Sequence, residues 1–119
     1  MSLIAWVEIP VADFERALRF YTALLDAPLQ VMELGDTRMG MFPGECGGGA
    51  IVQGEGNVPG VDGVRVYLSG GDDLSPMLAR VAAAGGQIVV PKTEITPEFG
   101  YFALFHDSEG NCIGLHSSG

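Results

Sequence analysis

The chain carries one pattern of expected elements twice, and this repeat limits its possible folds more than any other feature. In the first copy, alternating apolar residues predict a strand over 3–11. Asp13 can cap a helix that Pro28 ends near Asp26. Three short strands bounded by glycine, proline or aspartate follow, over 29–34, 37–42 and 49–53.

The second copy begins after a glycine-rich stretch over 54–63. A strand over 61–69 precedes a helix with Asp72, Asp73 or Ser75 as its cap, Pro76 in its first turn and Gly85-Gly86 at its end. Further strands are predicted over 87–90, 93–95 (weakly), 101–106 and 112–116. The turn over 107–111 places Gly110 where a positive φ is needed.

Both helices have an apolar stripe that predicts packing on one face of a four-stranded sheet. The stripes are Phe14, Ala17, Leu18, Tyr21 and Leu25 in the first helix, and Leu74, Leu78, Val81 and Ala82 in the second. The strand residues predicted to face the helices are Val7, Ile9, Val64, Val66, Ile113 and Leu115.

The predicted fold class is α+β, with two tandem βαβββ modules forming a curved, incompletely closed mixed β-sheet around a central cleft. Residues 1–119 are expected to form a single domain, with module 1 about 1–57 and module 2 about 61–119.

Composition limits the classes of molecule that this protein is expected to bind and the compartment in which it is expected to work. Hydrophobic residues make up 47% of the 119 residues, enough for a core without disulfides or metals, and the net charge is −9. That charge argues against nucleic acid and against an anionic membrane surface. Two cysteines, Cys46 and Cys112, are too few for a disulfide framework, and Glu8 and Pro10 interrupt the early apolar run. We therefore expect a cytoplasmic protein.

Both copies resemble the vicinal oxygen chelate superfamily, which includes glyoxalase I, extradiol dioxygenases and bleomycin-resistance proteins. The resemblance rests on Ile9-Pro10-Val11-x-Asp13-x-x-Arg16-Ala17-x-x-Phe20-Tyr21 in the first copy. In the second copy it rests on Tyr67-Leu68, Asp73-Leu74, Gly85-Gly86 and Asp107-Ser108-Glu109-Gly110-Asn111-x-Ile113-Gly114-Leu115. The resemblance implies the fold described above and a dimer. It does not specify an activity, because one fold hosts many chemistries. Open sheet edges also favour a homodimer.

Members of this family that use a metal bind it with His, Gln or Glu side chains from four strands. The matching positions here are Trp6, Ala50 (or a neighbour), Arg65 (or a neighbour) and Gly114. None of these side chains is a usual ligand for a divalent ion. We therefore expect no metal and no other cofactor.

Strand alternation places six candidate ligand-binding residues on the cleft side: Trp6, Glu8, Arg65, Tyr67, Cys112 and His116. Arg65 either forms a structural ion pair with Glu8 or holds an anionic group of the ligand. Trp6 either stacks on a planar ligand or fills the space left by the metal.

For three of the other candidates, a purely structural role is the alternative to ligand binding or catalysis. Tyr67 is more often a lining residue than an acid or base. A buried, inert thiol is the simpler interpretation of Cys112. His116 is more often an exposed or capping histidine than a catalytic one.

The sequence thus predicts a glyoxalase/bleomycin-resistance-like protein that binds a small organic ligand, aromatic or anionic, without a metal. The alternative is a metal-dependent or acid–base lyase, isomerase or dioxygenase of the same superfamily. A third hypothesis is an interaction module whose cleft is filled by Trp6, Met39 and Met41.

Overall fold

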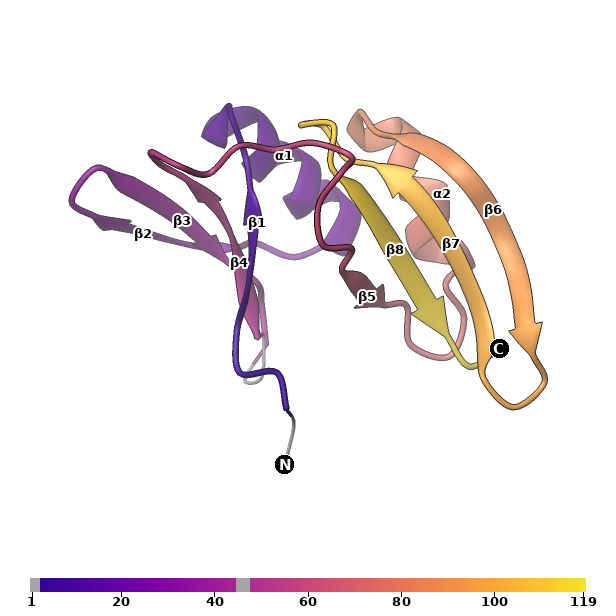
Figure 1. The fold of residues 1–119 in the computed structure, drawn as a ribbon. Helices are drawn as coiled ribbons and strands as arrows, with labels where there is room; N and C mark the ends of the chain where they lie inside the picture. The colour runs from indigo at the N-terminus through magenta and orange to yellow at the C-terminus, as the bar shows by residue number, and fades with distance from the viewer. Residues whose placement is uncertain (1–2, 45–47) are drawn as a thin grey trace. The chain divides into compact units, whose positions relative to one another are not determined.

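The computed structural model describes residues 3–44 and 48–119, and Cys46 lies outside them. The chain forms two compact units, Met1–Pro59 and Gly60–Gly119. Each unit has one helix and one four-stranded mixed sheet, in the order strand, helix and three strands (Figure 1). The predicted α+β class and the two βαβββ modules are confirmed.

The sheet of the first unit has the strand order β1-β4-β3-β2. Its strands are β1 (Val7–Pro10), β2 (Gln30–Leu34), β3 (Thr37–Met41) and β4 (Gly49–Gln53). The strand β1 runs parallel to β4, and the other neighbours are antiparallel. The bounds of β2, β3 and β4 lie within one residue of the predicted ranges, because turn residues mark their ends. The strand β1 is shorter than the predicted strand over 3–11, since residues 3–6 form no strand.

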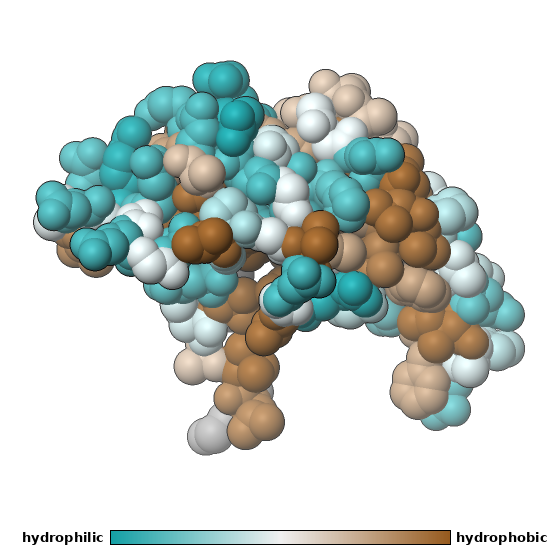
Figure 2. Space-filling view, turned by 45° about the horizontal axis from the view of Figure 1, so that its top comes forward, coloured by the Kyte–Doolittle hydropathy of each residue, from teal (hydrophilic) through white to brown (hydrophobic). Residues whose placement is uncertain are grey.

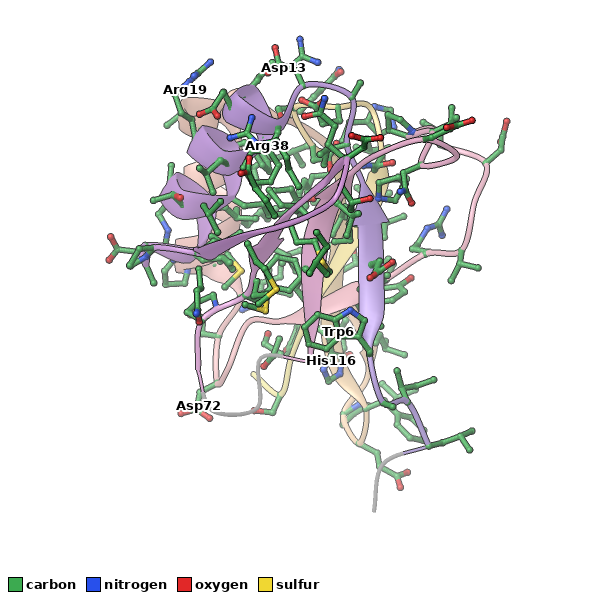
Figure 3. All side chains as sticks on the ribbon, turned by 90° about the vertical axis from the view of Figure 1, so that its left-hand side faces the viewer. Trp6, Asp13, Arg19, Arg38, Asp72 and His116 are labelled. Atoms are coloured by element: carbon green, nitrogen blue, oxygen red, sulfur yellow. The ribbon has the colours of Figure 1, made fainter. Side chains whose placement is uncertain are left out.

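Helix α1 (Phe14–Leu25) begins where the sequence predicts, since the Asp13 carboxylate accepts a hydrogen bond from the Arg16 backbone N–H at 3.1 Å. It ends at Asp26, whose φ of 53° is left-handed. The helix packs against β4, and Arg38 of β3 braces its first turn, with Nη2 2.7 Å from Glu15 Oε1 (Figure 3).

The buried stripe of α1 differs in part from the predicted one. Phe14, Ala17 and Tyr21 are buried as expected, but Phe20 and Leu24 replace Leu18 and Leu25, which are half-buried. The predicted spacing is still helical. The buried stripe is rotated because two aromatic residues, Phe20 and Tyr21, both pack inward, edge to face at 5.0 Å between ring centroids.

The sheet of the second unit has the strand order β5-β8-β7-β6. Its strands are β5 (Tyr67–Ser69), β6 (Gln87–Thr96), β7 (Gly100–His106) and β8 (Cys112–Ser117). The strand β5 runs parallel to β8 and the other pairs are antiparallel, so this sheet has the same arrangement as the first.

The strand β5 is much shorter than the predicted strand over 61–69. Its pairing with β8 covers only Tyr67 to Ser69, plus a hydrogen bond from Gly114 N–H to Val66 O at 2.8 Å. The prediction that Val64 faces the helix is wrong, because its side chain is 94% exposed. Residues 61–66 alternate like a strand, but they form no strand in the structure.

Helix α2 (Ser75–Ala84) has Pro76 in its first turn and Gly85, at φ 108°, as its C-cap, as predicted. Its N-cap is Leu74, which makes no side-chain cap hydrogen bond, so the prediction of Asp72, Asp73 or Ser75 as the cap is wrong. Leu78 and Val81 are buried and Leu74 is buried just before the helix, whereas Ala82 is exposed, against the prediction. The helix packs against β6.

One long strand, β6, replaces the two short ones predicted over 87–90 and 93–95. It lies at the sheet edge, and its register against β7 shifts between Ile88 and Val90 and again between Val90 and Thr93, the interval that contains Pro91. Proline cannot donate to a ladder, and edges and bulges are where strands accept it. Pro91 therefore marks an irregularity within one strand, and not the end of a strand as predicted.

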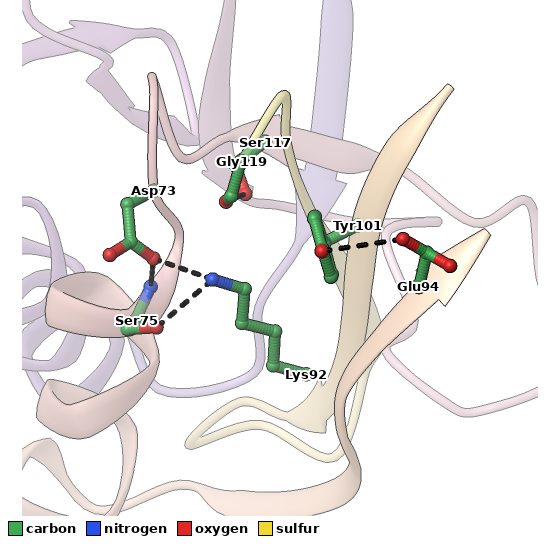
Figure 4. Close-up of polar contacts among 7 residues, drawn as sticks. All are labelled: Asp73, Ser75, Lys92, Glu94, Tyr101, Ser117 and Gly119. Atoms are coloured by element: carbon green, nitrogen blue, oxygen red, sulfur yellow. Dashed lines mark hydrogen bonds and ion pairs between the residues drawn. The ribbon is translucent and has the colours of Figure 1, made fainter. Parts of the chain in front are cut away.

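A polar cluster joins the start of α2 to β6 (Figure 4). Asp73 Oδ1 accepts hydrogen bonds from the Ser75 backbone N–H and from Lys92 Nζ, both at 2.9 Å. Lys92 Nζ also lies 4.7 Å from the centroid of the Tyr101 ring. These contacts favour the ionised carboxylate.

We expect this cluster to make stability depend on acid. The Ser75 N–H and then Lys92 lower the pKa of Asp73 from 3.8 to about 2. Because the folded pKa lies below the unfolded one, ionised Asp73 stabilises the fold above about pH 4, and this contribution is lost as the pH falls towards 2. A carboxyl ¹³C NMR titration should give a midpoint near 2 in the wild type and a higher one in Lys92→Met. An ordinary midpoint near 3.8 in the wild type would contradict the described contacts.

Candidate functional site

A pocket of about 430 Å³ lies on the sheet of the second unit, on the face away from the buried core. Its lining residues come from all four strands of that sheet: Tyr67 of β5, Ile95 of β6, Phe102 of β7 and His116 of β8. Phe102 and His116 are direct cross-strand partners. The volume is at the small end of the range for ligand pockets. The site therefore suits a small molecule with a largely apolar body.

Gly114 allows the Tyr67 side chain to take its place in this pocket. The two residues are paired between β5 and β8, and the Tyr67 ring lies directly over Gly114. A Cβ atom at position 114 would overlap the Cδ2 atom of that ring. The ring thus occupies the space into which any larger side chain at 114 would project.

Tyr67 also interacts with Arg65 and, through it, with Cys112. A side-chain hydrogen bond with Tyr67 raises the pKa of Arg65, and the charge interaction with the Cys112 side chain adds to the shift. Arg65 is exposed and Cys112 is a half-buried free thiol.

His116 lies on the exposed face of β8 and is held by the turn between β6 and β7. Its Nε2 atom is 2.7 Å from the backbone oxygen of Phe99. A carbonyl oxygen only accepts, so Nε2 carries the hydrogen and donates it. This contact fixes the orientation of the imidazole ring at the pocket.

In the first unit, the Trp6 indole Nε1 donates a hydrogen bond to Glu8 Oε2 at 3.2 Å. Both residues are exposed, and Trp6 lies along the segment that leads into β1 (Figure 3). On the same sheet, Met39, Ala50 and Val52 form a small buried cluster, with Met41 packed against it. These apolar residues occupy the face of β3 and β4 that points away from α1.

The structure thus groups the six predicted residues into sets. Tyr67 and His116 share the pocket, Arg65 and Cys112 stand beside Tyr67, and Trp6 contacts Glu8. An Arg65–Glu8 pair would join the two units and stays a prediction.

Sequence reasoning missed Phe102 and Ile95. Alternation along 101–106 could have placed Phe102 on the face of the sheet away from the core. The face of Ile95 could not be predicted in this way, because the register of β6 is irregular.

The four residues that the resemblance matches to metal positions have side chains that do not suit a divalent ion. Trp6 offers an indole N–H that already donates to Glu8, Ala50 offers a methyl group and Arg65 a guanidinium. Gly114 offers no side chain, and the Tyr67 ring covers it. Within residues 3–44 and 48–119, no group of three or more His, Cys, Asp or Glu side chains is placed to hold an ion.

Comparison with known proteins agrees with this fold. The family model described as Glyoxalase/Bleomycin resistance protein/Dioxygenase superfamily matches residues 3–115. The chain belongs to this superfamily. A "Glyoxylase-like domain-containing protein" from Didymella fabae is 30% identical over 113 residues, which cover 91% of this chain and 88% of the relative.

Solved structures of the glyoxalase superfamily share the fold at low identity. The fosfomycin resistance protein FosX from Listeria monocytogenes has a TM-score of 0.71 and 14% identity, covering 98% of this chain and 93% of its own. The antibiotic binding protein TnmS3 from Streptomyces sp. CB03234 has a TM-score of 0.63 and 22% identity, with 98% and 96% covered. At these identities the likeness establishes the fold alone.

The helices of this glyoxalase-superfamily member are short. In the described part of the chain, neither helix has the length and apolar character to cross a membrane.

Proposed function

We propose that this protein binds a small organic molecule with an aromatic or unsaturated part in the pocket formed by Tyr67, Ile95, Phe102 and His116, and that it does so without a metal ion. The pocket carries the proposal, because two aromatic rings and an aliphatic side chain surround one imidazole. Apolar walls with few polar groups are typical of ligand sites. The antibiotic binding protein among the structural neighbours supports small-molecule binding as a role for this fold.

Metal independence rests on the donor set. Bringing four family positions together would assemble an indole, a methyl group, a guanidinium and a glycine, none of which binds a divalent ion. The Tyr67 ring over Gly114 adds an aromatic surface at one of these positions. We infer that this member of the superfamily uses the corresponding space for ligand contact.

Arg65 is proposed to favour anionic ligands from the rim of the pocket. It is exposed and is oriented by Tyr67, which lines the pocket. Exposed ion pairs contribute about 0.2–1 kcal/mol, so Arg65→Ala should weaken binding of 2-naphthoate by up to about fivefold. Trp6 and Glu8 are proposed as further ligand contacts.

The proposal extends to organisation and location. Residues 1–119 act as one domain, in a cytoplasmic homodimer, for which the two-cysteine composition and the open sheet edges are the support. Size-exclusion chromatography with light scattering measures the mass of the protein in solution and decides between monomer and dimer.

A matched pair of isoleucines on β6 tests the ligand site. Ile95 lines the pocket and is 45% exposed, while Ile88 is 40% exposed and is not among its lining residues. Ile95→Ala should raise the dissociation constant of 2-naphthoate about tenfold, close to 1.4 kcal/mol, because apolar contact is lost. Ile88→Ala should leave it unchanged, and EDTA should change neither value.

Two results would count against this function. Equal effects of the two substitutions would place the ligand elsewhere. A stoichiometric divalent ion that elemental analysis finds in the protein, and whose removal abolishes binding, would favour the metal-dependent enzyme instead.

A further inference from the structure

One polar atom in the pocket, Nδ1 of His116, has no hydrogen-bond partner within the described chain. Ile95 and Phe102 are apolar, and the Tyr67 side chain interacts with Arg65, whose pKa it raises. His116 donates from Nε2 to the Phe99 backbone oxygen at 2.7 Å. Across residues 3–44 and 48–119, the His116 side chain makes no second hydrogen bond.

The contact with Phe99 decides what the other ring nitrogen can do. In a neutral imidazole one nitrogen donates and the other accepts, and the hydrogen bond made by the first fixes the role of the second. Since Nε2–H donates to a carbonyl, Nδ1 of neutral His116 has a free lone pair. The pocket therefore offers a hydrogen-bond acceptor on an otherwise apolar wall.

The neighbours of His116 do not supply that acceptor with a hydrogen. Its register partners are Phe102 on β7 and Ser69 on β5, and within the described chain no hydrogen bond joins the Ser69 hydroxyl to the imidazole. Tyr67 from β5 is the titratable group that shares the pocket, and Glu98 precedes Phe99 in the turn from β6. A ligand atom is thus the natural partner of Nδ1.

We propose that the ligand of this pocket is an aromatic molecule with a hydroxyl or N–H group on its ring, and that this group donates a hydrogen bond to Nδ1 of His116. The inference rests on the proposed function, because it concerns the same pocket. A ligand ring that covers Nδ1 removes it from water, and leaving an acceptor covered without a partner costs more than the bond itself yields, so a ligand without a donor is disfavoured. His116 would then select ligands by hydrogen bonding, while Tyr67, Ile95 and Phe102 hold the ring.

Two probes of nearly equal shape separate this inference from the proposed function. 2-Naphthol carries a donor, and 2-methoxynaphthalene has the same rings with the donor blocked. We expect 2-naphthol to bind at least tenfold more tightly to the wild type. We also expect the ¹⁵N resonance of His116 Nδ1 to shift on binding of 2-naphthol and to move little with the ether.

The two histidines of the chain provide the matched variants. His116→Phe should remove the preference for 2-naphthol and keep binding of the ether, whereas His106→Phe, which is outside the pocket, should keep the preference. The ¹⁵N measurement on the wild type stands even where a variant does not fold. If both probes bind equally well and Nδ1 does not respond, the donor inference is wrong and the pocket proposal survives. If neither probe binds, both are wrong.

Discussion

Replacing Phe105 with alanine is expected to lower the free energy of unfolding by about 3–5 kcal/mol, the range for deleting a fully buried phenylalanine. The Phe105 side chain is 0% exposed, on the helix-facing side of β7. Its partner in register is Ile113 of β8, which is also buried. Removing the ring would leave a cavity between strands that cannot close up. Chemical denaturation followed by circular dichroism measures the change.

Phe99 is the matched control for this substitution. It lies in the same unit and carries the same side chain, but it is 61% exposed, and its contact with His116 uses the backbone oxygen. Phe99→Ala should change the unfolding free energy by less than about 0.5 kcal/mol. Equal losses from the two substitutions would mean that the alternation along β7 is assigned to the wrong face.

The substitution Gly114→Ala should destabilise the protein by about 1–3 kcal/mol, as expected for overpacking. Alanine normally stabilises a strand relative to glycine by restricting the unfolded chain, so a loss here would report the clash specifically. The new Cβ would overlap the Tyr67 ring and displace it. Since Tyr67 lines the pocket, the variant should also lose affinity for 2-naphthoate.

Two further variants isolate that clash. Gly63→Ala places a methyl group in open space, so its stability should stay near that of the wild type. In the double variant Gly114→Ala/Tyr67→Ala the ring is absent, and the penalty of the alanine should largely disappear, a coupling that a double-mutant cycle measures. If Gly114→Ala costs as much with the ring absent as with it present, Tyr67 does not lie over Gly114.

Local chemistry explains why most of the fold could be predicted. The Asp13 cap, the Pro76 start and the Gly85 end of α2 each depend on a few neighbouring residues, and the structure has all three. The strand β4 has the predicted bounds, 49–53, because glycine precedes it and Gly54 follows it. Turn and cap residues act over short distances, so the sequence displays them directly.

Pairing between distant segments explains what could not be predicted. Val64 fits a strand pattern, but the segment 61–66 forms no strand, so the predicted strand was longer than β5. The irregular register of β6 against β7 likewise turns Ile95 into the pocket without a local signal.

The contents of the pocket required the structure as well. His116 was a predicted cleft residue, but its contact with Phe99 joins residues 17 positions apart. Figure 2 shows apolar side chains gathered on the surface over the β6 side of the second unit, where Ile88, Val89 and Ile95 are exposed. An edge strand of this character forms one wall of the proposed ligand site.

A crystal structure of the complex with 2-naphthol tests the ligand site most directly. In protein prepared with EDTA, we expect the naphthol ring to lie among Tyr67, Ile95 and Phe102, with its hydroxyl within hydrogen-bond distance of His116 Nδ1. A ligand bound away from these four residues, or bound only through a divalent ion, would contradict this expectation.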